Sequence, residues 1–344
     1  MKQIRLCLMI IVAAMAFAAC NDPEEHGDPR IEHPRYIATH DGKLYVTCYS
    51  PASVIRIDTA TLQQEALCRL GNYQPEGIAV AGGKLFVASS WIADEAGSPL
   101  YDNKVYVIDL NSFSVTDIIT VGVNPQKVMV VDDSHVIVNY IGNYDDITGG
   151  SVIIDVNTLA TSWTGQNTTS MCCYNGLVYG YDAPYGSGRV NFFCYNPATD
   201  TTLSLLEGNN IQTPYGINVI EGDIYITTGD YNANSDIYRF GADGTLKWRS
   251  EAGIYASKVV AIDDSAAYVL NEGNWGGSNA SLDRIRLSTG AISRDVFSAA
   301  NGRGLGDVAQ DVVIYGSRAY VAVSFSNTIE AVSLKDNTST RINL

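Results

Sequence analysis

Acid–base catalysis needs a titratable side chain beside a binding surface, and the histidines of this chain are poorly placed for that role. Two precede any strand pattern and two lie at or beside tight hairpins: His26 and His33, then His40 and His135. No Gly-x-Ser-x-Gly motif for a serine nucleophile is present. A carboxylate mechanism stays open, using Glu272 with Asp230 or Asp182. Because no pair of residues has a defined catalytic role, we expect a protein that is not an enzyme.

Metal binding is suggested by one segment in which oxygen-bearing side chains alternate: Asp230, Asn232, Asn234 and Asp236. The alternation is typical of a calcium loop, but the glycine expected at the sixth position and the distal glutamate are both missing. A polar loop built on Asx turns explains the same residues without a metal. Calcium therefore remains an open possibility, and we expect no required cofactor.

The seven cysteines divide by position. Cys7 lies in an N-terminal apolar run and Cys20 directly follows it. The others lie inside strand-like runs without zinc-type spacing: Cys48, Cys68, Cys172, Cys173 and Cys194. Their expected role is that of small buried hydrophobic residues, and one disulfide remains the alternative.

The elements that position these residues repeat along the chain. Five copies of one glycine-led phrase begin at Gly42, Gly83, Gly176, Gly222 and Gly316. Two degenerate copies begin at Ser134 and Ser265, which makes seven. The first reads Gly-Lys-Leu-Tyr-Val-Thr, a short apolar run led by a turn glycine, which is typical of a strand.

Each phrase is one strand of a larger unit. A short apolar strand precedes it, with a Gly, Asn or Asp turn between the two, which predicts a hairpin. A third strand follows and often ends in aspartate, as at Asp58 and Asp109, and a weaker fourth strand closes the unit. Residues 34 to 344 give roughly 44 residues per unit, the length of a propeller blade. We therefore predict an all-β fold, a seven-bladed β-propeller with four-stranded blades in one cooperative domain.

The N-terminus predicts export and lipidation. Lys2 and Arg5 precede an apolar run that ends in Ala18-Ala19 before Cys20, so residues 1–19 resemble a lipoprotein signal peptide and Cys20 the acylated residue. Residues 20–33 contain two prolines and several acidic residues, which predicts a flexible tether. Acidic residues behind the lipidated cysteine also resemble a surface-export signal of some Gram-negative bacteria. An outer-membrane, lipid-anchored protein at the cell surface is expected.

Charge argues against nucleic acid as a partner. The formal net charge is −15, and removing the signal peptide leaves 20 basic and 37 acidic residues. A chain this acidic repels a phosphate backbone.

One repeated phrase and three further segments carry a family resemblance. The Tyr-Val-Thr phrase at residues 45–47 and its copies resemble the YVTN/YncE-like propellers over the whole mature chain. Residues 270–282, 297–307 and 34–38 resemble more specifically the surface corrinoid-binding propeller lipoproteins of the BtuG type. In those relatives the Asn-Glu-Gly-Asn blade opens the domain, whereas here it is the sixth unit. A closed ring allows the chain to begin and end at a different blade, because every blade keeps the same neighbours.

Loop lengths indicate which face binds a ligand. The loops between second and third strands, and between blades, are long and aromatic, whereas the opposite loops are tight turns such as Asp41-Gly42. Aromatic side chains with polar tips suit a large amphipathic ligand, although some of them will pack loops together. The candidate ligand-binding residues are Trp91, Tyr140, Tyr144, Tyr185, Tyr215, Tyr231, Asn274, Trp275 and Arg303.

The resemblance implies a function. Proteins of that family capture cobalamin or related corrinoids and sit over a TonB-dependent outer-membrane transporter, so both are expected partners. A surface propeller that binds another ligand, a glycan or a protein, is the alternative. A propeller lyase or dehydrogenase is a third.

Overall fold

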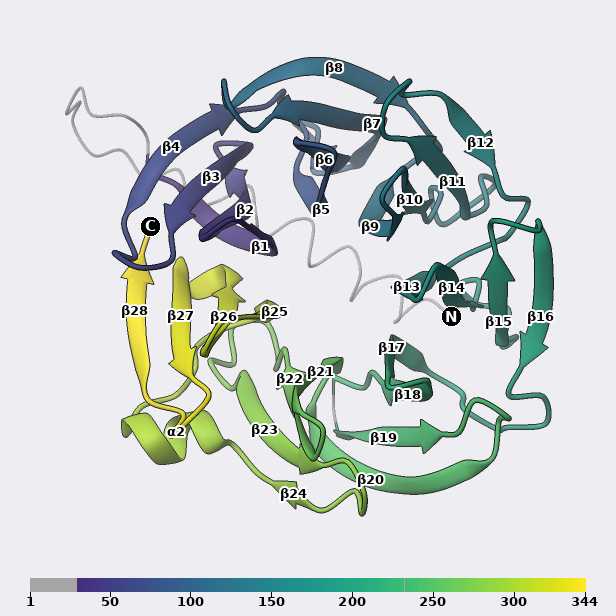
Figure 1. The fold of residues 1–344 in the computed structure, drawn as a ribbon, viewed down its shortest axis with the longest axis vertical. Helices are drawn as coiled ribbons and strands as arrows, with labels where there is room; N and C mark the ends of the chain where they lie inside the picture. The colour runs from purple at the N-terminus through teal and green to yellow at the C-terminus, as the bar shows by residue number, and fades with distance from the viewer. Residues whose placement is uncertain (1–29, 232) are drawn as a thin grey trace.

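The computed structural model describes residues 30–231 and 233–344, so Cys20, the signal peptide and most of the predicted tether lie outside the described residues. Seven four-stranded antiparallel sheets stand around a central axis, as Figure 1 shows. The prediction of a seven-bladed β-propeller is confirmed. Within the described residues no helix is long and apolar enough to cross a membrane.

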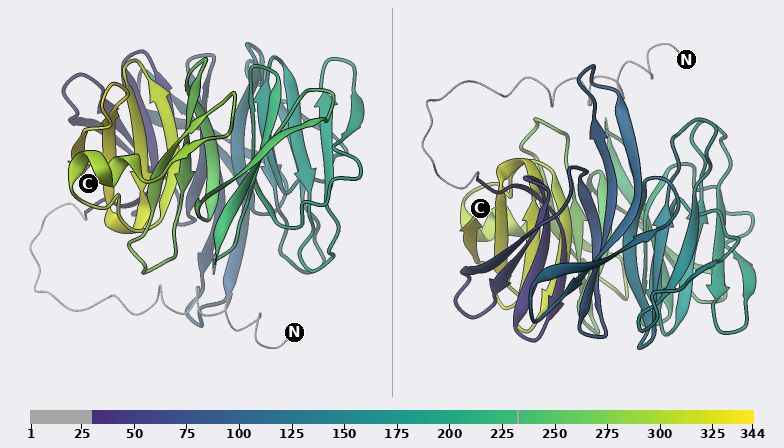
Figure 2. Two further views of the ribbon diagram at one scale, coloured as in Figure 1. Left: turned by 90° about the horizontal axis from the view of Figure 1, so that it is seen from below. Right: turned by 90° about the horizontal axis from the view of Figure 1, so that it is seen from above.

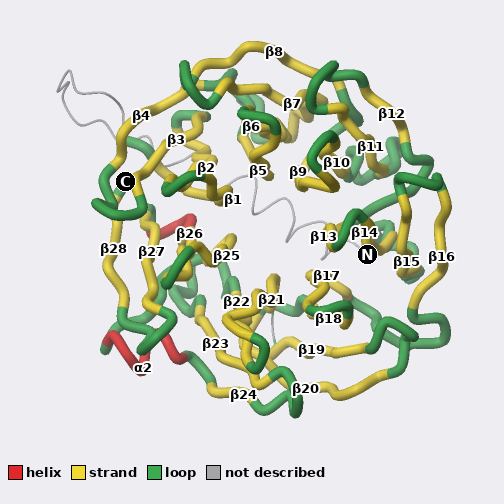
Figure 3. The backbone as a smooth tube through the Cα atoms, viewed as in Figure 1, coloured by secondary structure: helices red, strands yellow, loops and turns green. Residues whose placement is uncertain are grey.

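Each blade is built from four strands that are consecutive in the chain, so the tube in Figure 3 can be followed blade by blade. Blade 1 contains β1 (Glu32–His40), β2 (Lys43–Ser50), β3 (Ser53–Asp58) and β4 (Gln64–Arg69). Blade 2 contains β5 (Pro75–Ala81), β6 (Lys84–Ala93), β7 (Pro99–Asp109) and β8 (Ser114–Thr120). Blade 3 contains β9 (Pro125–Asp132), β10 (His135–Tyr140), β11 (Gly150–Asp155) and β12 (Thr161–Trp163).

The remaining blades follow the same plan. Blade 4 contains β13 (Ser170–Tyr174), β14 (Leu177–Asp182), β15 (Asn191–Asn196) and β16 (Thr201–Leu205). Blade 5 contains β17 (Pro214–Ile220), β18 (Asp223–Thr228), β19 (Asn234–Phe240) and β20 (Leu246–Ile254). Blade 6 contains β21 (Ala256–Asp263), β22 (Ala266–Asn271), β23 (Ser281–Arg286) and β24 (Ile292–Ser293). Blade 7 contains β25 (Ala309–Tyr315), β26 (Arg318–Val323), β27 (Thr328–Ser333) and β28 (Ser339–Asn343).

Turn chemistry sets the hairpins. Asp41 and Gly42 join β1 to β2 with φ of 45° and 74°, and Asn175 and Gly176 join β13 to β14 with φ of 49° and 75°. Positive φ at both central residues is the type I′ turn, whose twist matches that of paired strands. The aspartate that ends a third strand stabilises the next turn: Asp58 Oδ1 accepts the Thr61 backbone N–H at 2.8 Å.

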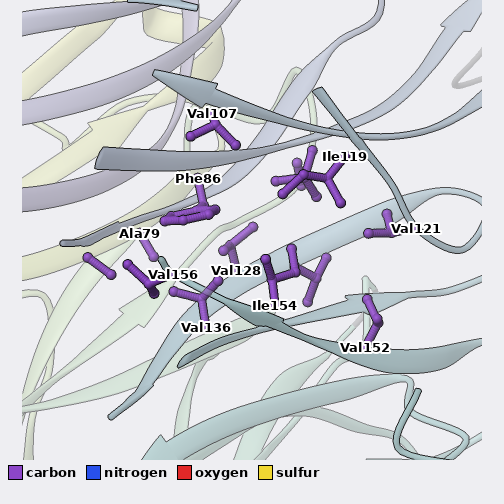
Figure 4. Packing of buried hydrophobic residues seen from close by; sticks show 14 residues of the cluster. Ala79, Phe86, Val107, Ile119, Val121, Val128, Val136, Val152, Ile154 and Val156 are labelled. Carbon is purple, nitrogen blue, oxygen red and sulfur yellow. The ribbon is translucent and has the colours of Figure 1, made fainter. Parts of the chain in front are cut away.

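The core lies between neighbouring blades. Phe86 and Val107 of blade 2 pack with Val128, Val136 and Ile154 of blade 3, and Figure 4 shows these side chains meeting. Equivalent apolar clusters fill the other interfaces. Because each blade buries its neighbours' faces, the seven blades form one domain.

Among residues 30–231 and 233–344 no strand is exchanged between the first and last blades, and packing and side-chain hydrogen bonds join these two blades. Ile37 of β1 donates its backbone N–H to Asp311 Oδ2 at 3.0 Å, and Gly42 donates its N–H to the Tyr315 hydroxyl at 2.7 Å. The His33 N–H bonds Asn327 Oδ1 at 2.9 Å. Strand β1 begins at Glu32, which pairs with Ser50 of β2.

Two features depart from the regular plan. The helix α2 (Val296–Asn301) lies outside blades 6 and 7, with the Asp295 carboxylate capping its N-terminus. The hairpin of β6 and β7 extends beyond the neighbouring loops, and it is the long blue hairpin in Figure 2. Among the described residues all five cysteines are free thiols, and four of them are buried, as expected of small hydrophobic residues.

Candidate functional site

A cavity of about 720 Å³ occupies the axis of the ring. Its wall is made by the first strand of each blade, the strands nearest the centre in Figure 1, and by the β10–β11 and β14–β15 loops. The volume lies in the range of pockets that hold small organic molecules. The cavity extends toward the face on which the sequence predicts the ligand, since these two loops belong to the long second-to-third-strand set.

Strand register places one residue from each blade at the same level of this channel. The residues paired with the middle of the second strands include Ile37, Val128, Val259 and Val312. In each blade, the residue immediately before the one paired with the middle of the second strand faces the axis. We call these seven residues the channel ring: Tyr36, Gly77, Lys127, Ser170, Gly216, Lys258 and Asp311.

Ion pairs hold most of the charges in and beside the channel ring. Lys258 Nζ lies 2.7 Å from Asp311 Oδ1, with the Asp311 carboxylate almost fully buried. Arg35 Nη2 lies 3.1 Å from Glu76 Oε2, and both side chains are largely buried. Each cation thus neutralises a carboxylate that is removed from water, which a buried charge requires.

Lys127 differs from these cations. Its ammonium donates to the Ser170 hydroxyl at 2.8 Å and has no carboxylate partner among the described residues. Burial, and then the ammonium of Lys258, lower the pKa of Lys127. A positive charge without a counter-ion therefore faces the channel.

Glu272 follows β22 and lies in the cavity wall, with 7% of its surface exposed. The Tyr215 hydroxyl donates to its two carboxylate oxygens at 3.1 and 3.0 Å. Burial raises the pKa of Glu272 to about 7, against the opposing effects of Arg35 and the Tyr215 hydrogen bond. The ring of Tyr215 packs edge-on against Tyr255 at 4.4 Å, and Tyr255 stacks on Tyr231 at 4.1 Å. An aromatic stack therefore connects this carboxyl group to the outer loops.

Four of the predicted ligand-binding aromatics remain exposed on the loop face. Their exposed fractions are 49% for Tyr144, 59% for Tyr185, 48% for Tyr231 and 43% for Trp275. They come from the second-to-third-strand loops of blades 3, 4, 5 and 6, which are consecutive around the ring. We call these four residues the aromatic crescent. Tyr144, Tyr185 and the predicted Tyr215 also line the cavity.

The other predicted residues are engaged inside the protein. Trp91 is half-buried and pairs with Tyr101 across the long hairpin. Tyr140 packs edge-on against Trp163 at 5.7 Å. Asn274 donates its side-chain amide to the Tyr231 carbonyl, which ties two crescent loops together.

Arg303 also interacts with another side chain of the protein. Its guanidinium makes two hydrogen bonds to the buried Glu330 carboxylate, at 2.9 and 2.7 Å. It lies beside α2, its charged group 4.9 Å from the Phe297 ring centre, and it does not line the cavity. The predicted hydrogen bond from Arg303 to a ligand would have to compete with this pair.

The predicted calcium residues are placed in β19 and the turn before it, and Asn232 lies outside the described residues. The Asp236 carboxylate accepts two hydrogen bonds from Arg249, at 2.9 and 2.6 Å. Asn234 donates its amide to Glu251 Oε1 at 3.0 Å. In residues 30–231 and 233–344 no three His, Cys, Asp or Glu side chains gather as a metal site. Of the carboxylates considered for catalysis, Asp182 pairs with Arg189 at 2.9 Å.

The sequence patterns alone did not predict a role for Lys127, Lys258, Asp311 or the Arg35–Glu76 pair. A signal for them exists, because several first strands have a proline at or near their start, two residues before the channel-ring position: Pro34, Pro75, Pro125 and Pro214. Aligning the seven first strands on this position would have collected the channel ring.

Comparison with known proteins supports the fold alone. No protein-family model and no curated protein sequence matches the chain. Among solved structures, the hydrazine synthase of Kuenenia stuttgartiensis has a TM-score of 0.63 at 13% identity, covering 94% of this chain and 99% of that one. The β-propeller domain of Myceliophteria thermophila Cps50 (Swd1) has a TM-score of 0.61 at 10% identity, covering 93% and 100%.

The computationally designed Ika8 protein has a TM-score of 0.57 at 9% identity and covers 90% of this chain and 83% of its own. Identities this low carry no information on activity. Together with the strand topology, these likenesses define the chain as a seven-bladed β-propeller.

Proposed function

We propose that this chain is a YncE-like, BtuG-type cell-surface lipoprotein that captures cobalamin or a related corrinoid and passes it to a TonB-dependent outer-membrane transporter. The observation that supports binding is the aromatic crescent, where four large aromatic side chains stay exposed on consecutive blades above a cavity. Exposed aromatic groups gathered on one face favour a binding surface over a purely structural role.

The chemistry of the crescent suits a corrinoid. Tyrosine and tryptophan offer flat apolar faces for a macrocycle and hydroxyl or indole N–H groups for its amide edge. A corrinoid has roughly ninety heavy atoms, more than the drug-sized ligands that such pockets enclose, so it would cover the cavity mouth. Because the crescent loops are held by rigid blades and by the Asn274–Tyr231 hydrogen bond, little ordering cost opposes binding.

Calorimetry with purified protein tests the binding proposal. We expect cobalamin or cobinamide to bind and the red colour to stay with the protein through gel filtration. Trp275→Ala and Tyr231→Ala should each weaken binding by about 2 kcal/mol, roughly thirtyfold in Kd, because each removes an exposed aromatic contact.

Leu203→Ala is the control, since Leu203 is 68% exposed but lies on the outer strand β16. It should bind like the wild type. Absence of both heat and colour transfer at micromolar protein would reject the corrinoid assignment. Tight binding that is insensitive to both crescent variants would reject this placement of the site.

Lipid attachment is a separate part of the proposal and rests on the signal-peptide pattern before Cys20. Cys20→Ala should move the protein from the membrane fraction to the soluble fraction without changing its Tm, because Cys20 precedes the first blade, whose strand β1 begins at Glu32. External protease should remove the wild-type protein from intact cells. Equal membrane retention of Cys20→Ala would contradict lipidation.

A further inference from the structure

The channel ring carries one more positive than negative charge. Its ionisable members other than Tyr36 are Lys127, Lys258 and Asp311, and the Asp311 carboxylate is already bonded by Lys258 and by the Ile37 and Val312 backbone N–H groups. The adjoining Arg35–Glu76 pair is neutral. Lys127 is therefore the one ammonium of the ring that makes no ion pair with a described residue, in a cavity that Glu272, Asp145 and Asp182 also line and where charge is weakly screened.

A second uncommitted donor lines the same cavity. The Asn218 side-chain oxygen accepts the Val259 backbone N–H at 2.9 Å, whereas its amide nitrogen makes no hydrogen bond to any described residue. An ammonium and an amide N–H₂ group are both donors, and an oxygen anion accepts from both. The lowered pKa of Lys127, caused by burial and then by Lys258, agrees with an ammonium that lacks a counter-ion.

We propose that the channel beneath the aromatic crescent is a second binding site, which takes a small organic monocarboxylate with its carboxylate group on Lys127. The cavity of about 720 Å³ accommodates a small organic molecule. The aromatic wall at Tyr215 packs against the apolar part of the ligand. The carboxylate site uses residues other than those proposed for corrinoid capture, because no member of the channel ring belongs to the crescent, whose Tyr144 and Tyr185 line the same cavity.

Charge selects a monoanion over a dianion. One negative charge balances the channel ring, whereas inorganic phosphate carries between one and two negative charges at neutral pH. The carboxylates of Asp311 and Glu272, which also line the cavity, repel the additional charge. Benzoate and acetate should therefore bind more tightly than phosphate, and benzamide, the neutral analogue of benzoate, should not bind.

The experiment measures the ligand-dependent rise in Tm and the calorimetric Kd for benzoate, acetate, benzamide and phosphate, on the protein without its signal peptide. Lys127→Met should weaken benzoate binding at least tenfold, and Lys127→Arg, which keeps the charge, should retain most of it. Lys104→Met is the matched control, because Lys104 also donates to a hydroxyl, that of Thr120, but on the exposed side of blade 2. It should bind benzoate like the wild type.

Three results would overturn the proposal: no benzoate binding, phosphate or benzamide binding as tightly as benzoate, or full benzoate binding by Lys127→Met. The Tm of each variant without ligand shows that it is folded, and Lys127→Arg provides the comparison if Lys127→Met is unstable. A protein that binds benzoate but no corrinoid would reject only the proposed function. The opposite pattern would reject only the channel site.

Discussion

At the residue scale, the environment of Glu272 in the folded protein changes the pKa of its side chain. It follows β22 in the segment Asn271-Glu272-Gly273, and by sequence it is one acidic loop residue among many. In the structure its carboxyl group is buried against Tyr215 and shares the cavity with Lys127. Burial raises its pKa to about 7, so both protonation states are populated near neutral pH. The folded state favours the protonated form, which gives stability a pH dependence.

The sign of that dependence follows from linkage. The ordinary pKa of a glutamate lies well below 7, so Glu272 is neutral in both states at low pH and must be charged in the folded state above pH 7. Its contribution to the free energy of unfolding is therefore lost as pH rises from about 4.5 through 7. Glu272→Gln should remove this loss and stabilise the protein at pH 8 by up to about 3 kcal/mol, because its amide oxygen still accepts the Tyr215 hydroxyl.

Urea unfolding of the wild type and Glu272→Gln at pH 5.5 and pH 8 measures the effect. The variant should gain stability relative to the wild type as pH rises between the two values. An equal difference at both values would show that the carboxyl group does not titrate in this range.

At the element scale, the first strand of each blade performs two tasks. Its alternate residues fill the interfaces between blades, and the residues near its start face the channel. The close approach of neighbouring first strands explains Gly216, since a Cβ there would meet the Ser257 carbonyl oxygen at 2.2 Å. Gly77 is constrained in the same way by the backbone of residues 126–128. Neither position can supply a side chain to the channel ring, so its charges come from the remaining blades.

At the scale of the whole molecule, stability depends on an unbroken ring. Deleting blade 5, residues 214–255, removes two apolar interfaces and exposes the faces of β13–β16 and β21–β24. We expect this deletion to abolish the single cooperative thermal transition, because the interfaces stabilise blades that are not stable alone. Scanning calorimetry measures it, and a sharp transition near the wild-type Tm would contradict a ring in which all interfaces are required.

A circular permutant is the matched control. Ile31 and Leu344 pack on the same apolar cluster, so a short linker can join the ends of the described chain. New termini in the tight turn at residues 132–134 leave every blade interface in place. The permutant should therefore unfold in one cooperative transition, since only the position of the cut has changed.

The sequence by itself determined the blades. The repeated strand phrases, the Asp-Gly and Asn-Gly turns and the aspartates that end several third strands act between residues that are close in the chain, and the structure confirms the architecture they predict. The loop face could also be predicted, because all second-to-third-strand loops emerge on one side of a propeller. The exposed Tyr144, Tyr185, Tyr231 and Trp275 were all among the candidates.

Only the tertiary structure decided how the candidate side chains are used. Arg303 donates to Glu330, and Asn274 donates to the Tyr231 carbonyl. The partners are 27 and 43 residues apart in the sequence, and no local pattern predicts such pairs. The channel ring assembles one residue from each of seven separate strands, so its unbalanced charge appears only when the ring closes. The mode of closure was open for the same reason, since it depends on how β1 meets β25 from the other end of the chain. Local patterns specify strands and turns, whereas the residues of a site on the axis of a ring come from segments that are far apart in the sequence.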